Sequence, residues 1–152
     1  VRKISTELRP SVLDTSGIDE AIEWQIDEFK KYFNIEVDFS CSSPEVELEK
    51  KKSLMLFRII QEALTNSVRH GEASHVRIMM NAENGEIVCV VKDNGKGFNP
   101  QQKGQDASFG LLGMHERAAY CGGSLHIESS PEDGTAVHVR IPFRENEVCY
   151  ES

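Results

Sequence analysis

The sequence predicts an α+β domain in which one mixed sheet of about five strands carries its helices on one face. The expected elements follow the order helix, strand, helix, hairpin, loop, helix, hairpin. Because a hairpin requires antiparallel pairing, this order excludes a doubly wound parallel sheet. With 152 residues, of which 39% are hydrophobic, the chain is long enough to bury one core. We therefore expect one two-layer domain.

Two helical patterns with a short strand between them fill the first half of the chain. Apolar residues recur at spacings of four and three over residues 18–33, which predicts the core face of an amphipathic helix. Ser16 and Asp19 resemble a capping box at its start. Alternation over residues 35–39 predicts a strand, and a second helix is expected over about residues 51–70.

The second half of the chain predicts two hairpins. Residues 76–80 alternate in polarity, and Asn84-Gly85 favours a tight turn into an apolar strand over residues 86–92. The alternation over residues 125–141, interrupted by a turn, predicts the second hairpin.

A long loop and a third helix are expected between these hairpins. Residues 94–109 are polar and have no apolar period, and a loop of this length in a compact domain is usually functional. We expect it to be mobile until a phosphate meets the helix that follows, which is predicted over residues 112–120.

The bulk composition narrows the class of protein. A net charge of -8 argues against a nucleic-acid surface, and no apolar run is long enough for a membrane helix. The four cysteines form no CxxC pair, which favours buried or incidental thiols in a reducing compartment. The start at Val1 without a methionine leads us to expect a piece of a longer protein, whose parent is soluble or membrane-anchored.

An acidic residue at the end of an apolar strand gives the first candidate site. Asp93 follows the apolar run 87–91, and Gly95 and Gly97 come just after it. A carboxylate can accept a hydrogen bond from an exocyclic amine, and glycine lets backbone approach a flat ring closely. The segment predicts a nucleotide pocket, although an acidic turn after a strand is more often only a turn.

A polar stripe on the second helix gives the second candidate. Arg58, Glu62, Asn66 and His70 follow one another in steps of four, with Arg69 beside them. Apolar residues share this stripe, which suits a pocket wall better than a face meant only for water. The amide oxygen of Asn66 suits Mg²⁺, and Glu62 could polarise a water molecule.

Two glycine segments complete the pattern. Gly110-Leu111-Leu112-Gly113 is expected to open the third helix, where free N–H groups and the helix dipole favour an anion. Gly134-Thr135 begins the last strand, where a hydroxyl could support an acidic ligand group or simply form part of a hairpin turn. The sequence contains no Walker pattern and no GxGxxG around Gly95.

Together these segments resemble the ATP-binding catalytic domain of bacterial sensor histidine kinases, and most of all their nitrate-sensor-like subfamily. Residues 57–70 resemble the asparagine box of that family, and residues 93–98 resemble its first glycine box. Residues 110–118 resemble the second glycine box, and residues 134–137 resemble the closing glycine–threonine motif. The resemblance covers roughly residues 13–143.

The resemblance implies a Bergerat-type ATP site with three helices on one face of the sheet and a mobile lid. Asp93 would bind the adenine amino group, aided through water by Thr135, and Asn66 would ligate Mg²⁺. Glu62 would act as general base, unless the acid beside the phosphoacceptor histidine has that role. The residues that the resemblance places around the nucleotide are Asn66, Arg69, His70, Asp93, Gly95, Gly97, Gly110, Leu111, Leu112, Gly113 and Thr135.

The family transfers the γ-phosphoryl group of ATP to a histidine and then to an aspartate of a response regulator. No histidine precedes His70, so we expect the acceptor on a separate dimerisation domain, of which residues 1–12 are a remnant. Residues 13–145 would form the catalytic domain and residues 146–152 a tail.

The expected partners follow from the same resemblance. They are ATP or ADP with Mg²⁺, the phosphoacceptor domain of the same kinase and a response regulator, in the cytoplasm and without nucleic acid. The isolated chain would be a monomer and its parent a homodimer. The alternatives are another ATPase or an anti-sigma-like serine kinase of the same fold superfamily, or an interaction module whose nucleotide site has decayed.

Overall fold

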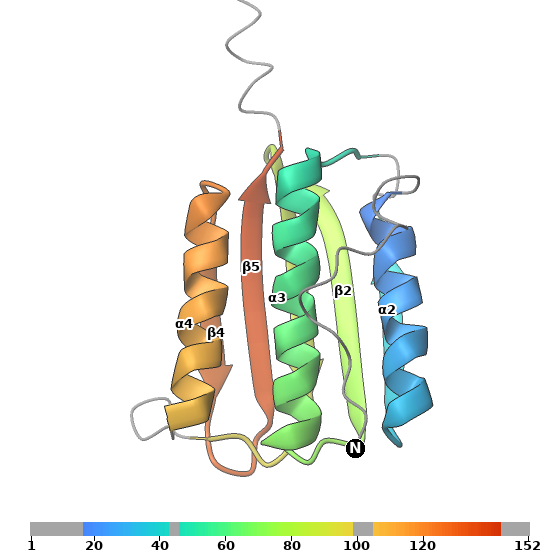
Figure 1. Ribbon diagram of the computed structural model, residues 1–152. Helices are drawn as coiled ribbons and strands as arrows, with labels where there is room; N and C mark the ends of the chain where they lie inside the picture. The colour runs from blue at the N-terminus through green and yellow to red at the C-terminus, as the bar shows by residue number, and fades with distance from the viewer. Residues whose placement is uncertain (1–16, 43–45, 99–104, 144–152) are drawn as a thin grey trace, which may run out of the picture.

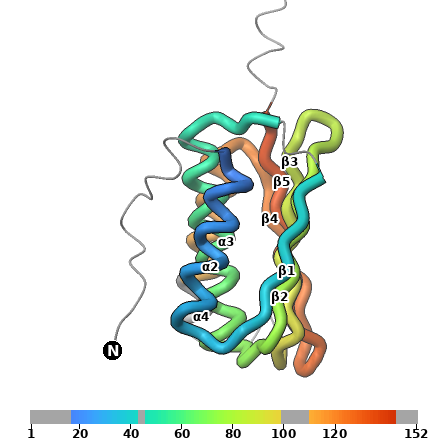
Figure 2. The backbone as a smooth tube through the Cα atoms, turned by 90° about the vertical axis from the view of Figure 1, so that its right-hand side faces the viewer, coloured from blue at the N-terminus to red at the C-terminus, as the bar shows by residue number. Residues whose placement is uncertain are grey.

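In the part of the chain that the structure describes, three helices pack side by side on one face of a five-stranded mixed sheet (Figure 1). This computed structural model describes residues 17–42, 46–98 and 105–143. In the view turned by 90°, the helices form one layer and the strands the other (Figure 2). The predicted two-layer α+β architecture is therefore confirmed.

The helices are α2 (Ile18–Tyr32), α3 (Lys50–Arg69) and α4 (Gln105–Tyr120). Helices α2 and α3 match the two predicted helices to within one residue. The capping box predicted from Ser16 and Asp19 is wrong, because the N-cap of α2 is Gly17 and no side chain caps it. Ser16 itself lies outside the described residues.

The sheet has the strand order β1-β2-β3-β5-β4. Strand β1 pairs in parallel with β2, and the chain crosses between them through α3, as a parallel pair requires. The β2–β3, β3–β5 and β5–β4 pairs are antiparallel, so both predicted hairpins are present. The strands span β1 (Glu36–Cys41), β2 (His75–Glu83), β3 (Glu86–Asp93), β4 (Ser124–Ser129) and β5 (Thr135–Pro142).

Turn chemistry fixes the first hairpin. Asn84 and Gly85 both have positive φ, at 55° and 79°, which is the conformation that a two-residue primed turn requires. The turn sets the register in which Ile78 lies opposite Val91. Both side chains are buried and face the helices.

The core lies between the two layers. Alternate residues of the central strands point toward the helices, and the apolar stripes of α2 and α3 cover them. Burying a side chain such as Phe or Ile contributes about 1.5–3 kcal/mol. The largest apolar side chains that are fully buried include Ile22, Phe29, Leu56, Phe57, Ile59, Ile60, Leu64, Ile78, Met114 and Ile141.

Helix α4 differs from its prediction. The expected loop extended to residue 109, but α4 begins at Gln105, so residues 105–109 are helical. Asp106 and Ser108 within this stretch, and Gly110 just after it, have low intrinsic helix propensity. Leu111, Met114 and Ala118 are buried at helical spacing, and this packing holds the helix together.

Some predictions fall on residues that the structure leaves undescribed. Residues 1–12 and 146–152, and residues 99–104 of the expected loop, lie outside the described part. Of the cysteines that the structure describes, Cys89 and Cys121 are buried, as expected, and Cys41 is half-buried, and none of these three forms a disulfide. No helix in the described ranges has both the length and the apolarity that a bilayer crossing demands.

Candidate functional site

The carboxylate of Asp93 is the centre of the candidate site. Asp93 is the last residue of β3 and is only 8% exposed. Its Oδ1 accepts hydrogen bonds from the Gly95 N–H at 2.8 Å and from the Thr135 N–H at 3.1 Å. Its Oδ2 accepts one from the Ser67 hydroxyl at 2.7 Å. Since a carboxylate has about four acceptor positions, Oδ2 can still accept one more donor.

Ser67 is a site residue that the sequence did not reveal. It lies on α3, is 2% exposed and reaches Asp93 from 26 residues away in sequence. Its hydroxyl also lies 3.0 Å from the Ala63 carbonyl oxygen, the local contact that a serine inside a helix commonly makes. Only the packing of α3 on β3 brings the hydroxyl to the carboxylate.

The glycines after Asp93 make room for neighbouring backbone. A Cβ on Gly95 would lie 2.5 Å from the carbonyl oxygen of Gly71, and the Lys96 N–H donates to that same oxygen at 2.8 Å. Gly97 has φ +66° and backs onto the Ser130 carbonyl group. These contacts between loops are a further reason for glycine at both positions, and close approach to a flat ring stays a prediction.

Thr135 supports Asp93 through its backbone. The Thr135 N–H donates to the carboxylate, whereas its hydroxyl shares a hydrogen bond of 2.8 Å with the hydroxyl of Ser129. Ser129 also accepts from the Phe98 N–H at 3.0 Å. The sequence had not indicated this contact with Ser129, and the expected support of the acid by the Thr135 hydroxyl through water stays a prediction.

The end of α3 presents the polar residues of the predicted stripe. The backbone carbonyl of Asn66 accepts from the N–H groups of His70 and Gly71 and so ends the helix. The side chain of Asn66 is half-buried and has no hydrogen-bond partner among the described residues. Arg69 and His70 are exposed beside it.

Glu62 meets α4 one turn before Asn66. A Cβ on Gly110 would overlap the Glu62 carboxylate, so the missing side chain of Gly110 gives Glu62 its space. The expectation that Gly110–Gly113 opens the third helix is wrong, because α4 begins at Gln105, whereas the anion site expected at these residues stays a prediction. In a helix, only the N–H groups of the first turn lack a partner within the helix. The N–H groups of Gly110–Gly113 lie beyond that turn. Leu111 is buried and Leu112 is 53% exposed.

Three of the four predicted segments converge directly. The end of α3, the Asp93 turn and the start of β5 are joined by hydrogen bonds, and α4 touches α3 at Glu62. Within the described ranges, no three His, Cys, Asp or Glu side chains are grouped to hold a metal ion. The site offers a ligand the buried carboxylate of Asp93, the side-chain amide of Asn66 and, beside it, the exposed guanidinium of Arg69.

Comparison with known proteins shows the family to which this chain belongs. Residues 51–145 match the family model described as histidine kinase-, DNA gyrase B- and HSP90-like ATPase. The histidine-protein kinase/phosphatase DegS of Brevibacillus brevis is 36% identical over 147 residues, which cover 97% of this chain and 38% of DegS. The sensor histidine kinase LiaS of Bacillus subtilis is 35% identical over 143 residues, covering 94% of this chain and 39% of LiaS.

A solved structure agrees at the level of the fold. The histidine kinase domain of the blue-light activated kinase from Erythrobacter litoralis EL346 has a TM-score of 0.68 at 18% identity, covering 85% of this chain and 61% of that one. The present chain spans about two-fifths of the length of the relatives it matches. The family model, however, matches more than half of this chain. The chain belongs to the histidine kinase-, DNA gyrase B- and HSP90-like ATPase family.

Proposed function

We propose that this chain is the ATP-binding catalytic domain of a sensor histidine kinase. It transfers the γ-phosphoryl group of ATP to a histidine on a dimerisation domain of the same kinase, for relay to a response regulator. The relatives DegS and LiaS are histidine kinases by name, which favours this activity over that of other ATPases or an anti-sigma-like serine kinase. The observation that carries the proposal is the fixed carboxylate of Asp93.

Asp93 selects adenine. Its Oδ2 keeps a free acceptor position beside the Ser67 hydroxyl, and the exocyclic amine of adenine is a donor that fits it. Guanine carries a carbonyl oxygen at the corresponding position, which would face the carboxylate as a second acceptor. Buried polar groups left unpaired are costly, so the site discriminates against GTP.

Asn66 holds Mg²⁺. Its amide oxygen is a hard ligand without a hydrogen-bond partner among the residues described, and Mg²⁺ needs few protein ligands when substrate phosphates supply the others. The bound ion supplies charge neutralisation on the phosphate oxygens. Arg69, exposed on the same helix end, adds positive charge near the phosphates, and His70 beside it adds a hydrogen-bond donor.

Glu62 is the candidate general base, and an acid beside the acceptor histidine is the alternative. The segment Gly110–Gly113 contacts the phosphates through its backbone. Because these N–H groups now lie inside α4, that contact requires the first turns of α4 to unwind when nucleotide binds. Gly95, Gly97 and the Thr135 backbone shape the loops that support Asp93.

The domain boundaries and partners complete the proposal. Residues 1–12 belong to the end of the dimerisation domain, residues 13–145 form the catalytic domain and residues 146–152 form a tail. The isolated chain is a monomer, whereas the parent kinase is a homodimer. The domain works in the cytoplasm, where ATP and a response regulator are available, and it does not bind nucleic acid.

Isothermal titration calorimetry with ATP and GTP, each with Mg²⁺, tests the adenine assignment. Asp93→Asn keeps the side-chain shape and should weaken ATP binding about ten- to a hundredfold. The matched control is Asp38→Asn, which removes an exposed carboxylate paired with His75 on β1 and β2. Equal affinity of the wild type for ATP and GTP would overturn the assignment, as would an unchanged affinity in Asp93→Asn.

A further inference from the structure

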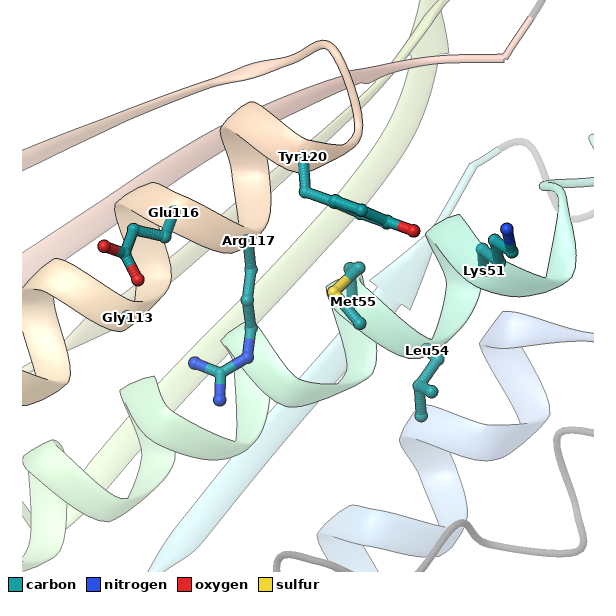
Figure 3. A pocket seen from close by; sticks show the side chains of 7 residues that line it. All are labelled: Lys51, Leu54, Met55, Gly113, Glu116, Arg117 and Tyr120. Carbon is teal, nitrogen blue, oxygen red and sulfur yellow. The ribbon is translucent and has the colours of Figure 1, made fainter.

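A hollow of about 440 Å³ opens between α3 and α4 (Figure 3). Its walls come from the first two turns of α3 and the second half of α4. Met55 on this wall precedes Asn66 by eleven residues, or about 16 Å along the helix axis at 1.5 Å per residue. Apart from Gly113, which also ends the proposed phosphate-binding segment, the residues that line the hollow lie outside the candidate nucleotide site. The volume of the hollow falls within the range of small-molecule pockets.

One side of the hollow is apolar. Leu54 and Met55 are half-buried and pack against the core from α3. Tyr120 on α4 is 66% exposed, and its ring reaches across above Met55 (Figure 3). An exposed aromatic ring and a thioether that face each other form a surface on which a flat apolar group can pack.

The other side carries positive charge. Arg117 is half-buried and reaches from α4 toward α3 (Figure 3). Gly113, one turn earlier, gives it room, since a Cβ there would lie 2.9 Å from Arg117 Nη1. Within the described part of the chain, neither Arg117 nor Lys51, at the α3 end of the hollow, forms an ion pair.

This positive charge is unusual for the chain. Lys51 and Arg117 against Glu116 give the lining a net charge of +1, whereas the whole chain carries -8. The guanidinium of Arg117 is partly withdrawn from water and forms no ion pair with a carboxylate of the described residues. It therefore gains most from an anionic group with two oxygens that can accept two parallel hydrogen bonds.

We propose that this hollow binds a small anion with a flat apolar body, of the class of aromatic carboxylates and sulfonates. The anionic group binds Arg117, with Lys51 adding attraction from the rim, and the apolar body packs between Met55 and Tyr120. This binding is independent of ATP and does not rest on the proposed kinase activity.

The matched probes are 8-anilinonaphthalene-1-sulfonate and N-phenyl-1-naphthylamine, which share their rings and differ in the sulfonate. Fluorescence titration of the full chain should show the sulfonate binding about tenfold more tightly than the neutral amine. Arg117→Gln should remove that preference, and Arg117→Lys should keep part of it. Saturating ATP with Mg²⁺ should leave the probe bound.

Two further variants control for the loss of any positive charge and for loss of the folded structure. Arg77→Gln removes an exposed cation on the open face of the sheet and should change nothing. Met55→Glu places a carboxylate in the half-exposed wall and should abolish sulfonate binding while the circular dichroism spectrum stays native. Equal affinity for both probes, an unchanged preference in Arg117→Gln, or displacement of the probe by ATP would each overturn the proposal.

Discussion

The bond between Ser67 and Asp93 illustrates how one hydroxyl directs a binding group. Two backbone N–H groups hold Oδ1 of Asp93, and the Ser67 hydroxyl alone, among the described residues, holds Oδ2. The carboxylate therefore cannot rotate without losing a bond at each oxygen. The side chain that would meet a ligand is fixed before the ligand arrives, which lowers the cost of binding.

Ser67→Ala should weaken ATP binding about three- to tenfold, because one hydrogen bond to a charged group is lost while Asp93 remains. Ser53→Ala is the matched control: Ser53 is also a buried serine of α3, but it donates to the Leu48 carbonyl at the other end of the helix. Calorimetry on both variants checks this. A larger loss in Ser53→Ala than in Ser67→Ala would contradict the assigned role of Ser67.

Cys89 makes the free energy of unfolding depend on pH in the alkaline range. Complete burial in β3 raises the pKa of its thiol from an ordinary 9.0 to about 12. Between these values the unfolded chain loses the proton and the folded chain keeps it, so stability falls as pH rises above 9. The loss from this group is about 1.4 kcal/mol per pH unit.

Urea denaturation at pH 8, 9, 10 and 11 should therefore show a steeper loss of stability in the wild type than in Cys89→Ala. The variant starts from a lower stability, because it leaves a small cavity, but it lacks this titration. Parallel curves for the two proteins would mean that the thiol of Cys89 is not shielded in the folded state.

At the scale of elements, glycine has two different roles in this fold. Gly97 sits at positive φ with the Ser130 carbonyl behind it, where any side chain would strain the backbone and overlap a neighbouring loop. Gly113 lies inside α4 and faces only the movable end of the Arg117 side chain. Glycine is thus required by the backbone at Gly97, in the loop after β3, whereas at Gly113 in α4 it only leaves room for a side chain that can move.

Gly97→Ala should lower the free energy of unfolding by about 2 kcal/mol or more. Gly113→Ala should leave it unchanged or raise it by up to about 1 kcal/mol, because alanine favours helix and Arg117 can move. Thermal and urea denaturation of the two variants measure the difference. Equal destabilisation would mean that the backbone at Gly113 is as constrained as that at Gly97.

At the scale of the whole molecule, the two layers bring distant segments to one end of the sheet. Asp93 ends β3, Thr135 begins the adjacent strand β5, and Ser67 descends from α3 above them. Strand pairing fixes the first two positions, and helix packing on the sheet fixes the third. A site of this kind depends on the integrity of both layers.

The chain alone should not label itself with phosphate from ATP, because the proposed acceptor histidine belongs to a separate domain. Adding the dimerisation domain of a parent kinase in trans should yield weak labelling of that domain, because the two parts are no longer tethered. The label should be stable in alkali and labile in acid, as a phosphoramidate is. Acid-stable labelling of a serine in an added protein would instead favour the serine-kinase alternative.

The sequence by itself determined the order of the elements and the identity of most candidate residues. Local rules suffice for this: Asn84-Gly85 dictates a primed turn, and apolar spacing dictates the faces of α2 and α3. Asp93 and Asn66 could be found because each stands at the end of an element that these rules define. The motif order then indicated the family that the match over residues 51–145 supports.

Only the tertiary structure decided where α4 begins and which groups hold Asp93. Gly110 and Gly113 are weak helix formers and conceal from the sequence a helix that the packing of Leu111 and Met114 stabilises. Ser67, 26 residues from Asp93, has no local feature that distinguishes it from any other serine in a helix. Hydrogen bonds between residues far apart in sequence depend on how the two layers pack. Local sequence patterns do not predict that packing.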